Sequence, residues 1–144
     1  MNSLMRTFVV TILLTACAFA QQAAAPAYTP KFPGDPARSD NEAAAMGYMR
    51  VVVNAQKNYS KKHGGQYAPS LASLVGQGSF TKRMLPPKRG NYNVKFKGGA
   101  KEYSLWLTPD AVTPTERAFF VDESGVIKTE EDKQANSTSP KAKP

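Results

Sequence analysis

One short stretch of the chain is rich in side chains that could bind a charged ligand. Between positions 82 and 101 there are seven basic residues and no acidic residue: Lys82, Arg83, Lys88, Arg89, Lys95, Lys97 and Lys101. Tyr92 and Phe96 are interleaved with them, and basic side chains next to aromatic rings can bind single-stranded nucleic acid. The formal charge of the whole chain, +8, would add weakly specific attraction to DNA or another anionic polymer. These seven residues are the candidate site for a polyanion or a partner protein.

The same stretch has a simpler interpretation. Tyr92 and Phe96 alternate with the lysines at a period of two, which in a strand would turn the aromatic rings toward a core and the lysines toward solvent. The lysines would then only raise solubility. Trp106 presents a similar choice, because it lies on the opposite face from Leu105 and Leu107. It is either an exposed contact residue or a residue covered by another helix or loop.

No combination of residues predicts catalysis. Nucleophilic catalysis needs a nucleophile, a base and an orienting group, yet the chain has one histidine, His63, and one cysteine, Cys17. Asp122 and Glu123 are adjacent, so in a strand they would point to opposite faces and not act as a pair. Together with Asp110 they are too few to predict a calcium site, which needs several converging oxygen ligands. The sequence predicts no enzyme, no metal and no cofactor.

Residues 1–20 predict export. Arg6 provides a positively charged start, and residues 7–16 (TFVVTILLTA) form a short apolar run. Ala18 and Ala20 place small residues where a signal peptidase requires them, with cleavage before Gln21. The apolar run is shorter than the about 20 residues that a membrane span needs. We therefore expect an exported protein of the periplasm, the cell surface or the extracellular space.

The same segment supports a second interpretation. Residues 14–17 (LTAC) are similar to a bacterial lipobox, in which the cysteine is lipidated and becomes the mature N-terminus. Cys17 follows the apolar run directly and is the only cysteine of the chain. Ordinary cleavage would give a soluble protein, whereas lipidation at Cys17 would anchor the protein to a membrane. The sequence leaves both alternatives open.

Composition divides the rest of the chain into three parts. Residues 21–38 contain four prolines and predict a semi-extended linker rich in proline and alanine. Residues 39–128 carry the periodic apolar patterns of a folded domain. Residues 129–144 are nearly free of apolar side chains and predict a disordered tail.

Within the central part the pattern changes from helical to extended. Ser39 and Glu42 have the spacing of a capping box, and the apolar residues that follow recur at steps of three and four, which predicts one long helix up to residue 63. Period-two alternation and short apolar runs then predict strands over residues 92–97, 103–108, 117–121 and 126–127. We expect an α+β fold with one long N-terminal helix packed on a small antiparallel sheet of three or four strands.

Three ordered stretches carry a family resemblance. They are residues 45–59 of the predicted helix, ending in AQKNY, the segment GQYAPSLASL at 65–74, and the strands YSLWLTP and RAFFVDESGVI at 103–109 and 117–127. Together they resemble the globular domains of the type IV pilin superfamily, which includes the pseudopilins of type II secretion. The resemblance implies a pilin-like, non-catalytic domain of the kind found in filaments, secretion pseudopili and related surface proteins.

The N-terminus departs from the members of that superfamily that polymerise. Those members have a glutamate at the fifth mature position and a long apolar helix that follows directly. Here a proline-rich linker separates the short apolar run from the helix, and Glu42 begins an amphipathic helix, so Glu42 is not equated with that glutamate. We expect an accessory or surface component of a pilus or type II secretion-like system, acting by contact with other envelope proteins. The alternative is a periplasmic module that binds DNA or another polyanion through the seven basic residues.

Overall fold

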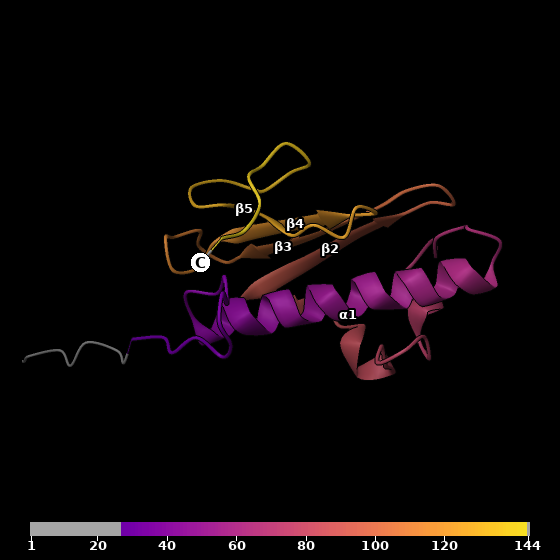
Figure 1. Ribbon diagram of the computed structural model, residues 1–144, viewed down its shortest axis with the longest axis horizontal. Helices are drawn as coiled ribbons and strands as arrows, with labels where there is room; N and C mark the ends of the chain where they lie inside the picture. Colours follow the sequence, from indigo (N-terminus) through magenta and orange to yellow (C-terminus); the bar gives the residue numbers. More distant parts are fainter. Residues whose placement is uncertain (1–26, 144) are drawn as a thin grey trace, which may run out of the picture.

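The protein has an α+β fold in which one long helix lies along one face of an antiparallel sheet (Figure 1). A computed structural model describes residues 27–143, so the predicted signal peptide and Cys17 lie outside the described residues. The elements in chain order are α1 (Asp40–Lys62), the 3-10 helices η1 (Ala72–Leu74) and η2 (Lys82–Met84), and the strands β1 (Lys88–Arg89), β2 (Tyr92–Gly98), β3 (Tyr103–Pro109), β4 (Ala118–Asp122) and β5 (Lys128–Glu130). Among residues 27–143, none of the helices combines the length and the hydrophobicity that a bilayer crossing would require.

Helix α1 begins at the capping residue that the sequence predicts. Ser39 has an extended backbone, and its hydroxyl accepts a hydrogen bond from the backbone N–H of Glu42 at 3.1 Å. This bond satisfies one of the N–H groups that the first turn of a helix leaves free. Ala45, Met49 and Val52 follow at helical spacing, are at most 2% exposed and lie in the core shared with the sheet. The predicted apolar stripe is therefore the face that packs on the sheet.

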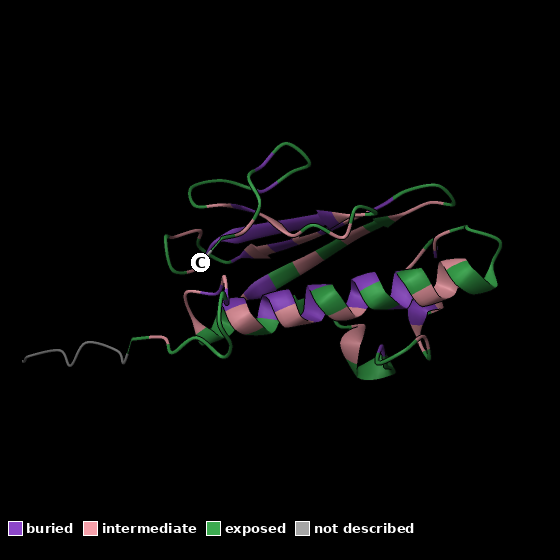
Figure 2. Cartoon of the chain, viewed as in Figure 1, coloured by how far each residue is buried: buried purple, intermediate pink, exposed green. Residues whose placement is uncertain are grey.

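The strands form a meander in which each strand pairs antiparallel with the next one along the chain. Across β3 and β4, Leu105 faces Val121 and Leu107 faces Phe119, and all four side chains are completely buried in the core with α1. Alternate residues of these strands point the other way. Figure 2 shows buried residues along the line where α1 meets the sheet. We call the side of the sheet toward α1 the inner face and the opposite side the outer face.

The predicted number of strands was too low, because the sheet has five strands and not three or four. The short strand β1 lies in the basic stretch before residue 92, where no strand was predicted, and it pairs Lys88 with Asn93 and Arg89 with Tyr92. A strand of two residues offers no periodicity that a sequence pattern could reveal. The helix is also not N-terminal, since residues 27–39 of the described chain precede α1.

The segment after β5 is held against the sheet, in contrast to the disordered tail predicted for residues 129–144. The N–H of Thr129 donates to the carbonyl of Pro140 at 2.9 Å, and the N–H of Ala142 donates to the carbonyl of Ile127 at 3.0 Å. Ala135 is 1% exposed and belongs to a small apolar cluster on the outer face. Composition did not reveal this arrangement because main-chain hydrogen bonds supply much of it, and any residue type can make them.

The described end of the proline-rich linker also folds back onto the domain. The hydroxyl of Tyr28 donates to the carboxylate of Asp35 at 2.6 Å, and the backbone N–H groups of Lys31 and Ala37 donate to the same carboxylate at 3.0 and 3.1 Å. These hydrogen bonds hold the pKa of Asp35 below its usual value, and the bond to Asp35 raises the pKa of Tyr28 to about 12. Asp35 is 5% exposed, so this segment belongs to the folded unit and does not act as a free spacer.

Candidate functional site on the outer face of the sheet

The structure divides the seven basic residues among several surfaces. Lys95 and Lys97 are exposed on β2 and point to the outer face, where they alternate with inner-face residues as predicted. Lys101 is exposed in the turn between β2 and β3. Lys82 and Arg83 are exposed in η2, before the sheet begins. The seven residues therefore do not form the single surface that their spacing in the sequence indicates.

Lys88 and Arg89 already have partners within the protein. The ammonium of Lys88 lies 3.0 and 2.8 Å from the two carboxylate oxygens of Asp110. Arg89 lies over the ring of Tyr48, with 4.8 Å between the guanidinium carbon and the ring centre, and donates to a backbone carbonyl of η2 at 3.0 Å. Adjacent residues of a strand point to opposite faces, so Lys88 and Arg89 are separated by the sheet itself.

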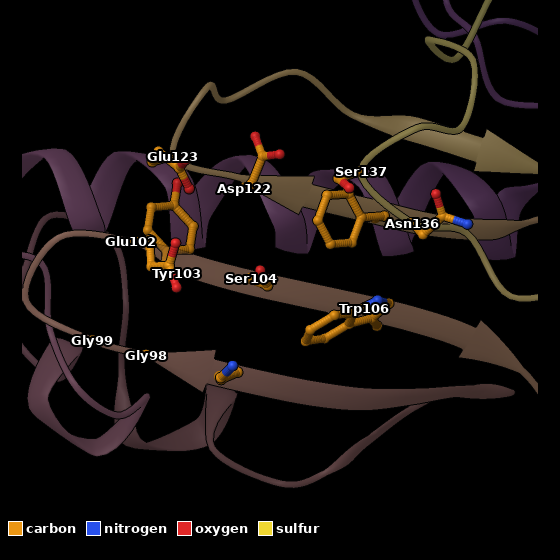
Figure 3. Close-up of a pocket in the computed structure, with 12 residues that line it drawn as sticks. Gly98, Gly99, Glu102, Tyr103, Ser104, Trp106, Asp122, Glu123, Asn136 and Ser137 are labelled. Atoms are coloured by element: carbon orange, nitrogen blue, oxygen red, sulfur yellow. The ribbon is translucent and has the colours of Figure 1, made fainter.

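A pocket of about 390 Å³ lies on the outer face, where β3 and β4 meet the loop after β5. Figure 3 shows Ser104 and Trp106 on β3, Asp122 at the end of β4, and Asn136 and Ser137 on the loop. All five lie around the same space, although they come from three separate parts of the chain. We call this space the outer pocket.

Two aromatic rings form the apolar part of the outer pocket. Trp106 is opposite Phe120 in the register of β3 and β4, and their ring centres are 5.4 Å apart at an angle of 61°. The ammonium of Lys95 lies 5.5 Å from the centre of the Trp106 ring, and that of Lys128 lies 5.8 Å from the Phe120 ring. Both distances allow attraction between a cation and an aromatic face. Trp106 is half-buried, because Phe120 and the cluster containing Ala135 cover part of it.

Charged side chains lie around the rings. Three carboxyl groups and one ammonium group line the outer pocket, from Glu102, Asp122, Glu123 and Lys97. The carboxylate of Asp122 accepts from the backbone N–H of Ser124 at 3.0 Å and lies 3.7 Å from the ammonium of Lys128. Burial raises the pKa of Tyr103, at the start of β3, above its usual value, so its hydroxyl stays protonated at neutral pH.

A different ionisable cluster is enclosed in the core and was not foreseen from the sequence. Glu42 and Arg117 are 0% and 1% exposed. One carboxylate oxygen of Glu42 accepts from the backbone N–H and from Nε of Arg117, both at 2.9 Å, and the other accepts from the terminal guanidinium nitrogen at 2.8 Å. Arg117 also donates to the carbonyl of Pro36, and Glu42 accepts from the N–H of Arg38 at 2.8 Å. Protein groups satisfy this pair on all sides, which indicates a structural role.

The other candidates for catalysis or metal binding lie apart from one another. His63 is exposed at the end of α1, where its ring stacks on Tyr59 with 3.8 Å between the centres. Asp110 binds Lys88, as described above, at the far end of β3 from Glu123. Within residues 27–143, no group of three acidic, histidine or cysteine side chains lies close enough together to hold a metal ion.

No family model, curated protein or solved structure matched this chain. The resemblance to pilin-like domains therefore rests on the residue patterns quoted above. The function has to be inferred from those patterns and from the geometry of the molecule.

Proposed function

We propose that this chain is an exported, non-enzymatic protein of pilin-like or pseudopilin-like type. It serves as an accessory or surface component of a pilus or of a type II secretion-like system, and it acts by contact with other envelope proteins. The observation that carries this proposal is the arrangement of the fold, in which one long helix precedes an antiparallel meander and packs along one face of it. This is the order of elements that the resemblance implies.

The chemistry of the described chain also supports a binding role. Its buried ionisable pair, Glu42 and Arg117, is bound internally and offers no free group to a substrate. The predicted signal peptide would deliver the domain to the envelope, either as a soluble protein or through a lipid at Cys17.

Mild cross-linking of the native envelope tests the proposal directly. The full-length gene product is expressed at its natural level, cross-linked with a short amine-reactive reagent and purified through an affinity tag at its C-terminus. We expect covalent complexes with other exported proteins of a pilus or secretion assembly. A sample that is denatured before cross-linking is the control and should give no such complexes. Recovery of the uncomplexed protein alone from both samples would refute the proposal.

The intact mass of the mature protein distinguishes the two anchoring alternatives. A chain that begins at Gln21 without added mass is a soluble exported protein. A chain that begins at Cys17 with the mass of acyl groups is a lipoprotein. Either result fits export, whereas an unprocessed chain found in the cytoplasm would contradict it.

Binding of an anionic polymer is a second candidate function, and one observation favours it. Lys95, Lys97 and Lys101 are exposed and neighbouring, and within residues 27–143 none of them forms an ion pair, in contrast to Lys88 with Asp110. Unpaired lysines on one surface can neutralise phosphates or sulfates and release counterions. We expect retention on heparin at low salt that weakens steeply as salt rises.

Two triple variants with the same change in charge distinguish a localised polyanion-binding site from a general effect of net charge on heparin retention. One replaces Lys95, Lys97 and Lys101 with glutamate, and the control replaces the exposed lysines of α1, Lys57, Lys61 and Lys62, in the same way. A binding site predicts that only the first variant elutes at clearly lower salt. Equal losses in both variants would mean that net charge alone causes the retention.

A further inference from the structure

The outer pocket holds groups of both hydrogen-bonding types without partners in the described chain. Within residues 27–143, neither the indole N–H of Trp106 nor the side-chain amide N–H₂ of Asn136 donates a hydrogen bond to the protein. The hydroxyls of Ser104 and Ser137, which can donate and accept, have no partner in this part of the chain either. The carboxylate of Glu102 adds an acceptor. A matching ligand must therefore both donate and accept.

Charge restricts the ligand further. Three carboxyl groups and the ammonium of Lys97 line the pocket, and two more ammonium groups lie beside its aromatic rings, so the charges balance and an anion would meet the three carboxylates. A small cation would meet the ammonium groups of Lys95 and Lys128, which already lie 5.5 and 5.8 Å from the two aromatic rings. A neutral group avoids both conflicts. Hydroxyl groups are neutral, and each can donate and accept at once.

The aromatic pair adds the last requirement, an apolar surface on the ligand. Trp106 is half-buried and contributes one edge of the pocket beside Phe120. A pyranose ring has C–H groups that pack on an aromatic surface and hydroxyls around its rim that bind polar side chains. The volume of about 390 Å³ lies within the range of about 300–1,000 Å³ that is typical of small-molecule sites.

We propose that the outer pocket binds a neutral saccharide unit, with the sugar ring against Trp106 and its hydroxyls bonded to Ser104, Asn136 and Glu102. An envelope polysaccharide and a soluble oligosaccharide both present this chemistry. The site does not depend on the protein–protein role proposed above, because its residues and its test are separate. Sugar binding could be found or lost without changing the cross-linking result.

The single tryptophan makes the test direct, because Trp106 is the only tryptophan of the chain and its fluorescence reports the pocket alone. The purified mature protein is titrated with chitotetraose, cellotetraose and mannotetraose, and with a heparin tetrasaccharide as the anionic comparison. We expect a saturable change in fluorescence with at least one neutral sugar and a Kd on the order of 1 mM or tighter. In about 0.5 M salt, which screens the exposed lysines beside the pocket, the heparin fragment should give no saturable change.

Variants on the same strand connect the signal to the pocket. Ser104→Leu fills the space and removes a hydroxyl, and it should weaken binding by about tenfold or more. Thr108→Leu is the matched control, since Thr108 shares the outer face of β3 but does not line the pocket, and its Kd should stay at the wild-type value. Asn136→Ala, on an exposed loop, is a second variant should Ser104→Leu disturb folding, which circular dichroism would show.

The outcomes are distinguishable. No saturable response to any of the three neutral sugars would overturn the proposal, as would an unchanged affinity in both Ser104→Leu and Asn136→Ala. A stronger response to the heparin fragment would replace it with polyanion binding. If a neutral sugar binds, a monosaccharide of the same type separates the two sources: equal affinity indicates a single terminal unit, and tighter binding of the tetrasaccharide indicates a polysaccharide chain.

Discussion

The two faces of strand β3 differ in how far the protein itself buries their side chains and pairs their polar groups. On the inner face, Leu105 and Leu107 are completely buried against α1. The buried side-chain amide of Gln56 on that side is also paired, since it donates to the carbonyl of Ala68 at 3.2 Å and accepts from its N–H at 2.8 Å. On the outer face, Ser104 and Trp106 are half-buried and lie beside a pocket whose polar groups include several without a partner in residues 27–143.

This difference suggests that the inner face mainly stabilises the fold and that the outer face is available for binding. Burial of apolar surface drives folding, and a buried polar group without a partner costs free energy. A face that carries the core is therefore expected to exclude water and to pair its buried polar groups. An outer face with open hydrogen-bonding groups contributes less to folding and is available to a ligand. Substitutions on the inner face should therefore change the free energy of unfolding, and substitutions on the outer face should change binding.

The largest expected effect comes from the buried ion pair. Glu42→Leu leaves the guanidinium of Arg117 buried without its carboxylate, and it should lower the free energy of unfolding by about 3–5 kcal/mol. The double variant Glu42→Leu/Arg117→Met removes both charges and should be more stable than either single variant. Urea denaturation followed by circular dichroism measures all three. A double variant no more stable than the worse single variant would show that the two residues are not energetically coupled.

Substitutions at two neighbouring residues of β3 compare how much each face contributes to the free energy of unfolding. Leu107→Ala creates a cavity on the inner face and should cost about 2–5 kcal/mol. Thr108→Ala, the next residue and on the outer face, should cost about 1 kcal/mol or less. The same urea experiment applies to both. Similar losses from the two variants would mean that both faces support folding equally.

Much of this architecture could be predicted from the sequence. The helix was recognisable because its apolar residues repeat every three or four positions and Ser39 caps its start. The alternation along β2 and β3 predicted which residues point inward, and Tyr92, at 1% exposure, confirms this. These signals are local, since each depends on residues a few positions apart. Local signals were sufficient for the α+β class.

The remaining features depend on contacts between distant positions. Glu42 and Arg117 are 75 positions apart, and the sequence indicated only a cap at one and the start of a strand at the other. The outer pocket joins β3 and β4 to Asn136 on a segment whose composition predicted disorder. The basic residues were close in sequence but lie on several surfaces, because a short strand and a turn separate them. No local pattern could have shown any of these arrangements.

Two adjacent glycines where β2 turns into β3 allow a test of how closely the backbone at residues 68–69 packs against this end of the sheet. A Cβ atom on Gly98 would lie 2.6 Å from the carbonyl oxygens of Ala68 and Pro69, whereas one on Gly99 would lie 3.5 Å from its nearest neighbour. Gly98→Ala should therefore force the backbone apart and cost about 1–3 kcal/mol. Gly99→Ala is the control and should change the thermal midpoint little. If both variants melt with the wild-type protein, the loop at residues 66–69 is free to move away.

The smallest expected effect lies at the edge of the outer face, in the exposed pair of Lys88 and Asp110. The hydrogen bonds from Lys88 and then Asn93 hold the pKa of Asp110 below its usual value. A carboxyl group with a lowered pKa in the folded state stabilises the fold above its unfolded pKa of about 3.9, and this contribution is lost as the pH falls through the folded value. Asp110→Asn should therefore lower the thermal midpoint slightly at pH 7.

The pH and salt dependence identify the cause of that small shift. The difference in thermal midpoint between wild type and Asp110→Asn should narrow as the pH falls below about 4, because the wild-type carboxyl is then protonated as well. It should also shrink in 1 M salt, since an exposed pair is screened. Asp132→Asn is the control, because Asp132 is exposed and has no ion pair within residues 27–143. A difference that persists at pH 2 would arise from the hydrogen bond of Asn93 or from packing and not from charge.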